Sequence, residues 1–105
     1  MAAIDDPVLI RFRAALDAAY GDRIERVVLF GSRARGDARP DSDYDVAVFL
    51  RNFDDFGRES RTLAAIETDI LYEDGALIGA MPFRAGAYAD RTGFMAEVRR
   101  DGVDL

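Results

Sequence analysis

The chain has 105 residues, half of them hydrophobic, which suits one compact domain and leaves little room for a second. It contains no cysteine and no histidine, which excludes disulfides, thiolate metal sites and the most common general base. Any bound metal should therefore be a hard cation held by oxygen, with Mg²⁺ the leading candidate.

The formal net charge of −6 is unfavourable for binding along a nucleic-acid backbone, so no direct nucleic-acid binding is expected. No apolar run reaches the length of a membrane span, and Asp5, Asp6 and Pro7 interrupt the N-terminus too early for a signal peptide. We expect one domain over residues 1–105, in the cytoplasm and without membrane contact. Whether it forms a homo-oligomer is left open.

The first predicted element is a helix over residues 6–20. Asp6 can cap its N-terminus, Pro7 suits the first helical position, and Gly21 can end it. Its apolar stripe follows helical spacing and consists of Leu9, Phe12, Leu16 and Ala19.

Residues 26–30 form a short strand with no polar alternation, which is typical of a strand covered on both faces. A polar connection follows over 31–42, and part of it can form a short helix that begins at Ser32 or Arg33. The second strand spans 43–50 and leads into a loop over 52–57.

A helix over 59–72, with Leu63, Ile66 and Ile70 on one side, ends at an Asp-Gly turn. A third strand follows over 76–81, which Pro82 ends or places at a sheet edge, and a last helix spans 91–100. This order predicts an α/β fold with a small mixed sheet flanked by helices. Four apolar side chains are expected in the core, with an exposed patch for a partner as the alternative: Met81, Phe83, Phe94 and Met95.

Two carboxylates, Asp43 and Asp45, stand two residues apart where the second strand begins. Alternate residues of a strand point to the same face, so both carboxylates would converge and repel unless a divalent cation lies between them. The alternative interpretation is a solvated turn. Tyr44, between them, should face the other side of the strand and serve packing.

A turn that suits phosphate, Gly31-Ser32, precedes this pair. Glycine lets the backbone approach a ligand, and the first N–H groups of a following helix attract anions. The alternative is an ordinary strand-to-helix turn that Ser32 caps. A Walker A loop is excluded, because Asp37 and Ala38 follow Gly36 where lysine and Ser or Thr are needed. The three-glycine pattern of a dinucleotide-binding loop is also absent.

The two segments together, Gly31-Ser32-Arg33-Ala34-Arg35-Gly36 and Ser42-Asp43-Tyr44-Asp45-Val46, resemble the signature of the minimal nucleotidyltransferases of the DNA polymerase β superfamily. The resemblance covers residues 24–83. It implies the polymerase β-like fold, a nucleoside triphosphate docked on Gly31 and Ser32, and Mg²⁺ ligated by Asp43 and Asp45, which are then also the catalytic residues. Arg33 and Arg35 are candidates for phosphate contact, with surface solvation as the equal alternative.

Many proteins of this type are antitoxins paired with an all-helical HEPN ribonuclease toxin, and some transfer AMP from ATP to a tyrosine of that toxin. The resemblance therefore implies nucleotidyl transfer, with ATP as substrate and a HEPN-type toxin as partner and acceptor. A small-molecule acceptor is disfavoured by the length of the chain.

The family's third carboxylate is expected on a later strand, and the strand over 76–81 carries no acid. A second hypothesis is therefore a degenerate nucleotide- and partner-binding antitoxin that neutralises its partner by contact alone.

Overall fold

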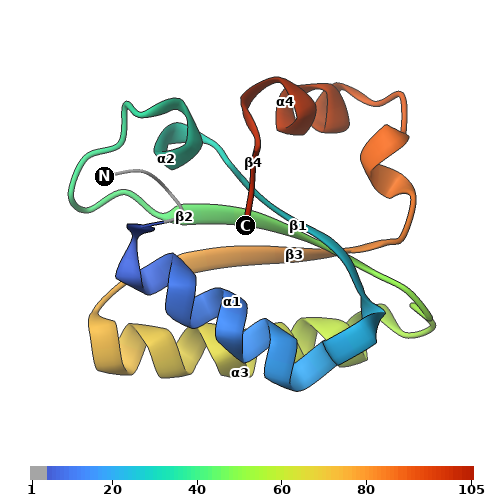
Figure 1. Ribbon diagram of the computed structural model, residues 1–105, viewed down its shortest axis with the longest axis horizontal. Coiled ribbons are helices and arrows are strands. Elements are labelled where there is room, and N and C mark those ends of the chain that lie inside the picture. Colours follow the sequence, from blue (N-terminus) through green and yellow to red (C-terminus); the bar gives the residue numbers. More distant parts are fainter. Residues whose placement is uncertain (1–4) are drawn as a thin grey trace.

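The computed structural model describes residues 5–105, which form a four-stranded mixed sheet with helices on both faces (Figure 1). The expected α/β class is confirmed. The elements, including two 3₁₀ turns, are α1 (Pro7–Tyr20), η2 (Gly21–Arg23), β1 (Ile24–Phe30), α2 (Ser32–Arg35), β2 (Tyr44–Leu50), α3 (Phe56–Asp74), β3 (Ile78–Arg84), η3 (Ala87–Ala89), α4 (Gly93–Asp101) and β4 (Val103–Asp104).

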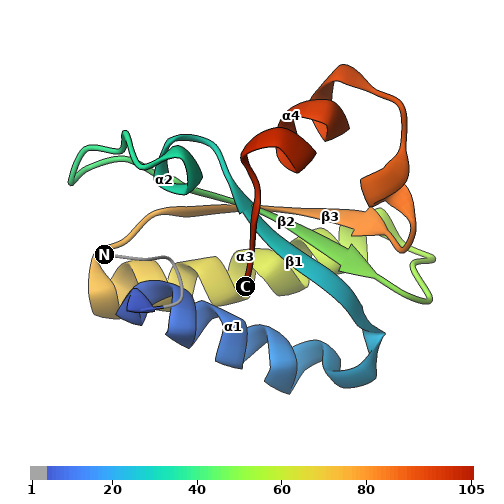
Figure 2. The same cartoon turned by 45° about the horizontal axis from the view of Figure 1, so that its top comes forward.

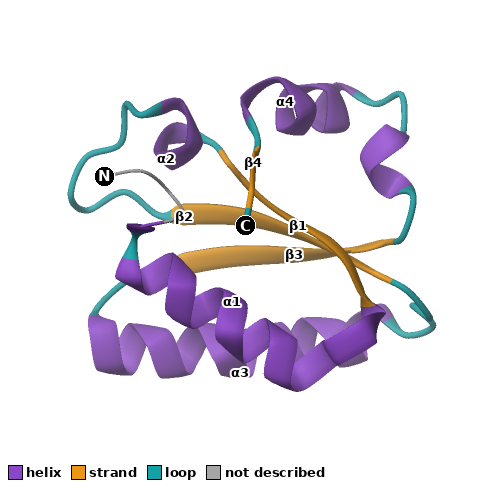
Figure 3. Cartoon of the chain, viewed as in Figure 1, coloured by secondary structure: helices purple, strands orange, loops and turns teal. Residues whose placement is uncertain are grey.

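The strand order in the sheet is β3-β2-β1-β4. β1 pairs antiparallel with β2 and with β4, whereas β2 and β3 are parallel and connected through α3. Figure 3 shows the three long strands side by side, with the short β4 at the C-terminus. Within the described residues, no helix is long and apolar enough to cross a membrane.

The two faces of the sheet have different partners. α1 and α3 cover one face and α4 lies on the other, as Figure 2 shows. α2 follows the end of β1, and its Ala34 packs against the core on the α1 side. Alternate residues of β1 are buried on the two sides, with Val27 and Leu29 toward α1 and α3, and Val28 and Phe30 toward α4. The predicted two-sided burial of this strand is confirmed.

α1 begins and ends as local chemistry dictates. The Asp6 carboxylate accepts a hydrogen bond from the Val8 N–H at 2.9 Å, and Gly21 ends the helix with a φ of +53°. One member of the predicted stripe is wrong, because Ala19 is exposed and Tyr20 is buried in its place. The large ring of Tyr20 fills space against α3 that a methyl group could not fill.

α3 is longer than predicted at both ends. Its N-cap is Asp55, whose carboxylate accepts from the Arg58 N–H at 3.1 Å, so the helix begins inside the expected loop. Glu59 is buried and pairs with Arg23, which ties α3 to the turn that follows α1.

β3 continues through Pro82 instead of ending there, because β3 is an edge strand. Proline has no N–H, and on an edge strand it can occupy a position whose N–H would not bond to the neighbouring strand. Two residues earlier, the Ala80 N–H donates to the Glu67 side chain at 3.2 Å. Proline and a carboxylate thus occupy this edge, which is a common protection against pairing with a further strand.

The C-terminal segment returns to the sheet as β4, which the sequence analysis did not predict. Val103 pairs with Leu29, and the Leu105 N–H donates to the Val27 carbonyl at 2.9 Å. Gly102 lets the chain come back to β1 after α4, since any other residue there would place its Cβ 2.5 Å from Cγ1 of Val28. α4 is thereby held against β1, close to the Gly-Ser turn.

Candidate functional site

Three residues form a row across the sheet at the end where the predicted site lies. Phe30 of β1 is opposite Asp45 of β2, and Asp45 is opposite Gly79 of β3. Asp45 is in phase with Ala47 and Phe49, which pack toward α4, so its side chain lies on the α4 face of the sheet. The pairing of β1 with β2 brings the Gly-Ser turn beside the second aspartate.

Gly31 and Asp45 are in direct contact. Gly31 has φ +75° and ψ −159°, a combination essentially restricted to glycine. A Cβ at Gly31 would lie 2.5 Å from Oδ2 of Asp45, which is closer than any real contact. The turn and the carboxylate therefore share one small space, and only glycine at position 31 leaves room for both.

The short helix α2 begins directly after this glycine, as predicted. The N–H groups of Ala34 and Arg35 both donate to the Gly31 carbonyl at 3.1 Å, and Gly36 ends the turn with φ +84°. Helix geometry leaves the N–H groups of Ser32 and Arg33 without an acceptor inside the helix. These two N–H groups and the half-buried Ser32 hydroxyl are donors suited to an anion.

The acidic pair, Asp43 and Asp45, is electrostatically coupled. Burial raises the pKa of Asp45, and the negative charge of Asp43 raises it further, while Arg35 lowers it. No hydrogen bond or ion pair among residues 5–105 engages either carboxylate. Two uncommitted, mutually repelling carboxylates form a donor set that fits a hard divalent cation.

β3 carries no acidic residue, and its residue directly opposite Asp45 is Gly79. Within the described part of the chain, no three acidic, histidine or cysteine side chains form a ready metal cluster.

A further acid that the sequence analysis missed comes from α4. Two contacts fix one side of this helix toward the site: the Phe94 ring packs edge-to-face on Phe30 with centroids 5.4 Å apart, and the Asp101 carboxylate lies 3.5 Å from Nη1 of Arg35. Glu97 lies between them on the same side of the helix. Its charge contributes to the raised pKa of Asp45. No sequence signal could indicate this, because the approach depends on how α4 docks on the sheet.

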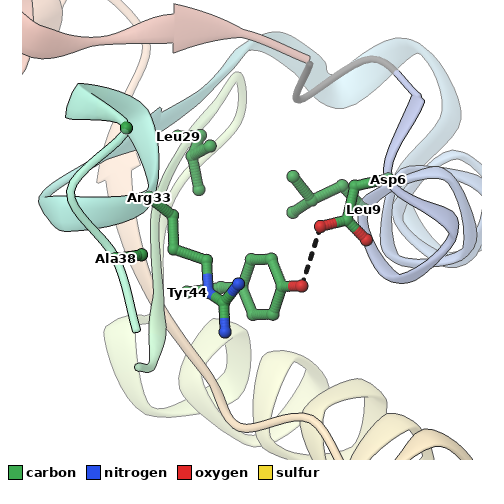
Figure 4. Close-up of a pocket in the computed structure, with 7 residues that line it drawn as sticks. Asp6, Leu9, Leu29, Arg33, Ala38 and Tyr44 are labelled. Carbon is green, nitrogen blue, oxygen red and sulfur yellow. Dashed lines mark hydrogen bonds between the residues drawn. The ribbon is translucent and has the colours of Figure 1, made fainter. Parts of the chain in front are cut away.

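The two candidate arginines have different surroundings. The Arg33 guanidinium donates to the Ser42 carbonyl at 2.7 Å and to the Pro40 carbonyl at 3.2 Å, and it stacks 4.0 Å above the Tyr44 ring (Figure 4). Arg33 thus holds the connection between α2 and β2. Arg35 lies toward Asp45, in loose contact with Asp37 and Asp101.

Tyr44 faces away from the acidic pair, as predicted, and is buried. Its hydroxyl donates to the Asp6 carboxylate at 2.8 Å, and burial together with this bond raises the pKa of Tyr44 to about 12. Tyr44 lines a hollow of about 270 Å³ on the α1 side of the sheet (Figure 4). Because Asp45 lies on the α4 face, this hollow is across the sheet from it.

The four apolar side chains expected in the core divide into two groups. Met95 is buried and Phe83 is half-buried, whereas Met81 and Phe94 are 36% and 37% exposed. The core interpretation is therefore wrong for the latter two, because α4 meets β3 only at Phe83 and leaves an open hollow beside it. They line a hollow of about 420 Å³, here called the β3 hollow, formed by Met81, Phe83, Asp90, Thr92, Phe94 and Met95.

The chain is similar to known proteins in sequence and in fold. Residues 9–85 match the family model described as "Nucleotidyltransferase domain". The chain is 26% identical over 98 residues to "Putative protein adenylyltransferase MJ0141" of Methanocaldococcus jannaschii, covering 93% of this chain and 95% of that protein. It is 39% identical over 44 residues to "Putative protein adenylyltransferase MJ0604" of the same organism, covering 42% of this chain and 44% of that protein.

Among solved structures, the fold is similar to "a putative nucleotidyltransferase from Sulfolobus solfataricus". The TM-score is 0.63 at 17% identity, with 92% of this chain and 75% of the other covered.

Proposed function

Since this chain belongs to the nucleotidyltransferase domain family, we propose that it transfers AMP from ATP to a hydroxyl group of a partner protein. The observation that carries this proposal is the contact between Gly31 and Asp45, which joins an anion-binding turn to an uncommitted acidic pair. The names of the two matched relatives, each printed as "Putative protein adenylyltransferase", support a protein as the acceptor.

Asp43 and Asp45 would hold Mg²⁺, which supplies positive charge to phosphate oxygens during phosphoryl-type transfer. Asp45 is held in position by β2 between two neighbouring strands, and Asp43 precedes it at the strand start. Binding a cation would relieve the repulsion that raises the pKa of Asp45.

The remaining residues would bind and orient the triphosphate. The Ser32 hydroxyl and the first N–H groups of α2 suit the departing phosphates, and Arg35 adds a nearby positive charge. Because the donors of Arg33 already bind two carbonyl groups, we assign Arg33 to positioning the connection that carries Asp43.

In the transfer step, the acceptor hydroxyl oxygen forms a bond to the α-phosphorus, and the bond from that phosphorus to the bridging oxygen breaks. Pyrophosphate leaves with the electron pair, and the hydroxyl proton passes to water or to a nearby carboxylate. Glu97 is the further carboxylate on this side of the sheet.

We further propose that the partner is a HEPN-type toxin and that the chain acts as its antitoxin, a role that rests on the motif resemblance. A second function, neutralisation by contact without transfer, is favoured by one observation: β3 carries no acid, and Gly79 stands opposite Asp45. The two functions predict different outcomes for variants of the acidic pair.

The test uses ATP labelled at the α-phosphate, Mg²⁺ and a HEPN-type toxin as the candidate partner. The wild type should label the partner, and a variant with both Asp43→Asn and Asp45→Asn should label it at least about a hundredfold less, since the metal site is lost. Asp69→Asn on the exposed side of α3 is the matched control and should retain transfer. If the wild type and the double variant both inhibit the partner and neither labels it, the result favours neutralisation by contact.

A further inference from the structure

The face of β3 that adjoins the acidic pair is partly uncovered. α4 packs through Met95 and Val98 on β1 and β2 and meets β3 at Phe83, while Gly79 and Met81 on the same face of β3 stay exposed. Gly79 is exposed there, followed by Met81 and then by the half-buried Phe83. At about 3.3 Å per residue, Met81 lies roughly 7 Å along the strand from Gly79. The exposed side of β3, here called the apolar track and formed by Gly79, Met81 and Phe83, therefore leads from Asp45 into the β3 hollow.

The strand order indicates which substrate this track can receive. The Gly-Ser turn follows β1 on one side of Asp45, and the β3 hollow lies on the other side. In a phosphoryl-type transfer, the incoming and leaving oxygens lie roughly in line on opposite sides of phosphorus. If the departing phosphates occupy the Gly-Ser turn, the acceptor approaches from the β3 side.

We infer that the β3 hollow binds apolar side chains that flank the acceptor hydroxyl on a segment of the partner protein. This inference rests on the proposed function and adds where the partner docks and what chemistry it presents. Gly79 places β3 directly beside the acidic pair, since a Cβ there would be in ordinary contact, at 3.8 Å, with Oδ1 of Asp45.

The hollow is built to receive such side chains. The Phe83 ring stacks on the Phe49 ring with a centroid separation of 5.5 Å, and its centroid lies 5.7 Å from that of Phe94. The aromatic wall of the hollow is therefore supported by the core beneath. A supported wall does not need to rearrange before binding, which lowers the cost of docking. Exposed apolar groups of this kind are enriched at interaction sites.

Docking should use this face and not the edge of β3. Pro82 has no N–H, and the Ala80 N–H is already bonded to Glu67. A partner segment that added a strand at this edge would find these two positions closed. Side-chain contact with the hollow is the remaining mode.

The first test uses the methionines as reporters. The chain has three, and two of them, Met81 and Met95, line the hollow, so ¹³C-methyl labelling reports on it directly. Met81→Leu assigns one signal while nearly conserving volume. Two peptides are compared, each with one tyrosine and terminal lysines, with the tyrosine flanked by leucines in one and by serines in the other.

With Mg²⁺ and a non-hydrolysable ATP analogue present, the leucine-flanked peptide should shift the Met81 and Met95 signals, and the serine-flanked peptide should not. The inference is overturned if neither peptide shifts them. It is also overturned if the ATP analogue alone shifts the Met81 signal as its main effect, because the hollow would then hold the nucleobase.

The second test separates this inference from the proposed function. Met81→Glu should weaken binding of the leucine-flanked peptide about tenfold, as expected for loss of one apolar contact and burial of a charge, while affinity for the ATP analogue stays within about twofold. Leu71→Glu, an exposed apolar position on α3, should change neither. Equal weakening by both variants would overturn the inference.

Failure of the proposed function has a different signature. If the wild type binds no ATP analogue, transfer is refuted, and peptide binding at the hollow is then measured without nucleotide. Retained peptide binding in the variant with both Asp43→Asn and Asp45→Asn would show that the docking surface is independent of the acidic pair.

Discussion

Gly31 meets two independent requirements at once. Its backbone lies in a region that other residues enter at a cost of about 1–3 kcal/mol, and its missing Cβ leaves space for the Asp45 carboxylate. Position 31 therefore needs a residue that adopts this backbone conformation and that also has no Cβ to displace the Asp45 carboxylate. This double constraint explains why a glycine, and no other small residue, precedes Ser32.

We predict that Gly31→Ala lowers the free energy of unfolding by about 1–3 kcal/mol and also weakens binding of the Mg²⁺–ATP analogue, because the methyl group displaces Asp45. Gly86→Ala is the matched control, since Gly86 also has a positive φ of +91° but nothing within 4 Å of its Cβ position. The control should lose stability and keep nucleotide binding. Denaturant unfolding and calorimetric titration measure the two effects, and normal nucleotide binding by Gly31→Ala would contradict the prediction.

At the scale of elements, Asp6 and Tyr44 connect the start of α1 to the start of β2. The Asp6 carboxylate caps the helix through Oδ1 and accepts from the Tyr44 hydroxyl through Oδ2. Arg33 stacks on the opposite side of the same ring and binds the preceding loop. The strand that carries Asp45 is thus anchored at its first residue by two other elements.

This connection predicts a pH dependence. The pKa of Tyr44 is about 12 in the folded protein against 10.0 for the free side chain, so the stabilisation is complete below pH 10 and is lost as the pH rises toward 12. Tyr44→Phe should cost about 1 kcal/mol at neutral pH for the lost hydrogen bond, and this difference should shrink above pH 10. Unfolding curves of both proteins from pH 8 to pH 11.5 provide the measurement, and a constant difference would refute the assignment.

For the whole molecule, the acidic pair is expected to lower stability when no cation is bound. The raised pKa of Asp45 means that folding disfavours its charged form, so wild-type stability decreases as the pH rises through that pKa. Asp45→Asn should therefore raise the melting temperature at pH 7, measured with a chelator present, and the increase should fade toward pH 3. An Asp45→Asn protein that is less stable than the wild type at pH 7 would contradict this view.

Local patterns in the sequence determined much of this molecule. The caps of α1, the two-sided burial of β1, the short helix after Gly31 and the opposite orientation of Tyr44 each depend on a few neighbouring residues, and the structure has all of them. The family follows from the same short segments, since Gly31-Ser32 and the acidic pair are close in sequence. Such features need no knowledge of distant contacts.

Other features were decided only by tertiary structure. Gly79 faces Asp45 because β2 and β3 pair in one parallel register, and Glu97 approaches because β4 and Gly102 hold α4 beside β1. Met81 and Phe94 remain partly exposed because α4 meets β3 only at Phe83 and leaves a hollow open beside it, although both side chains are of a type common in cores. Each depends on where a separate element docks, and side-chain type alone carries no information about that position.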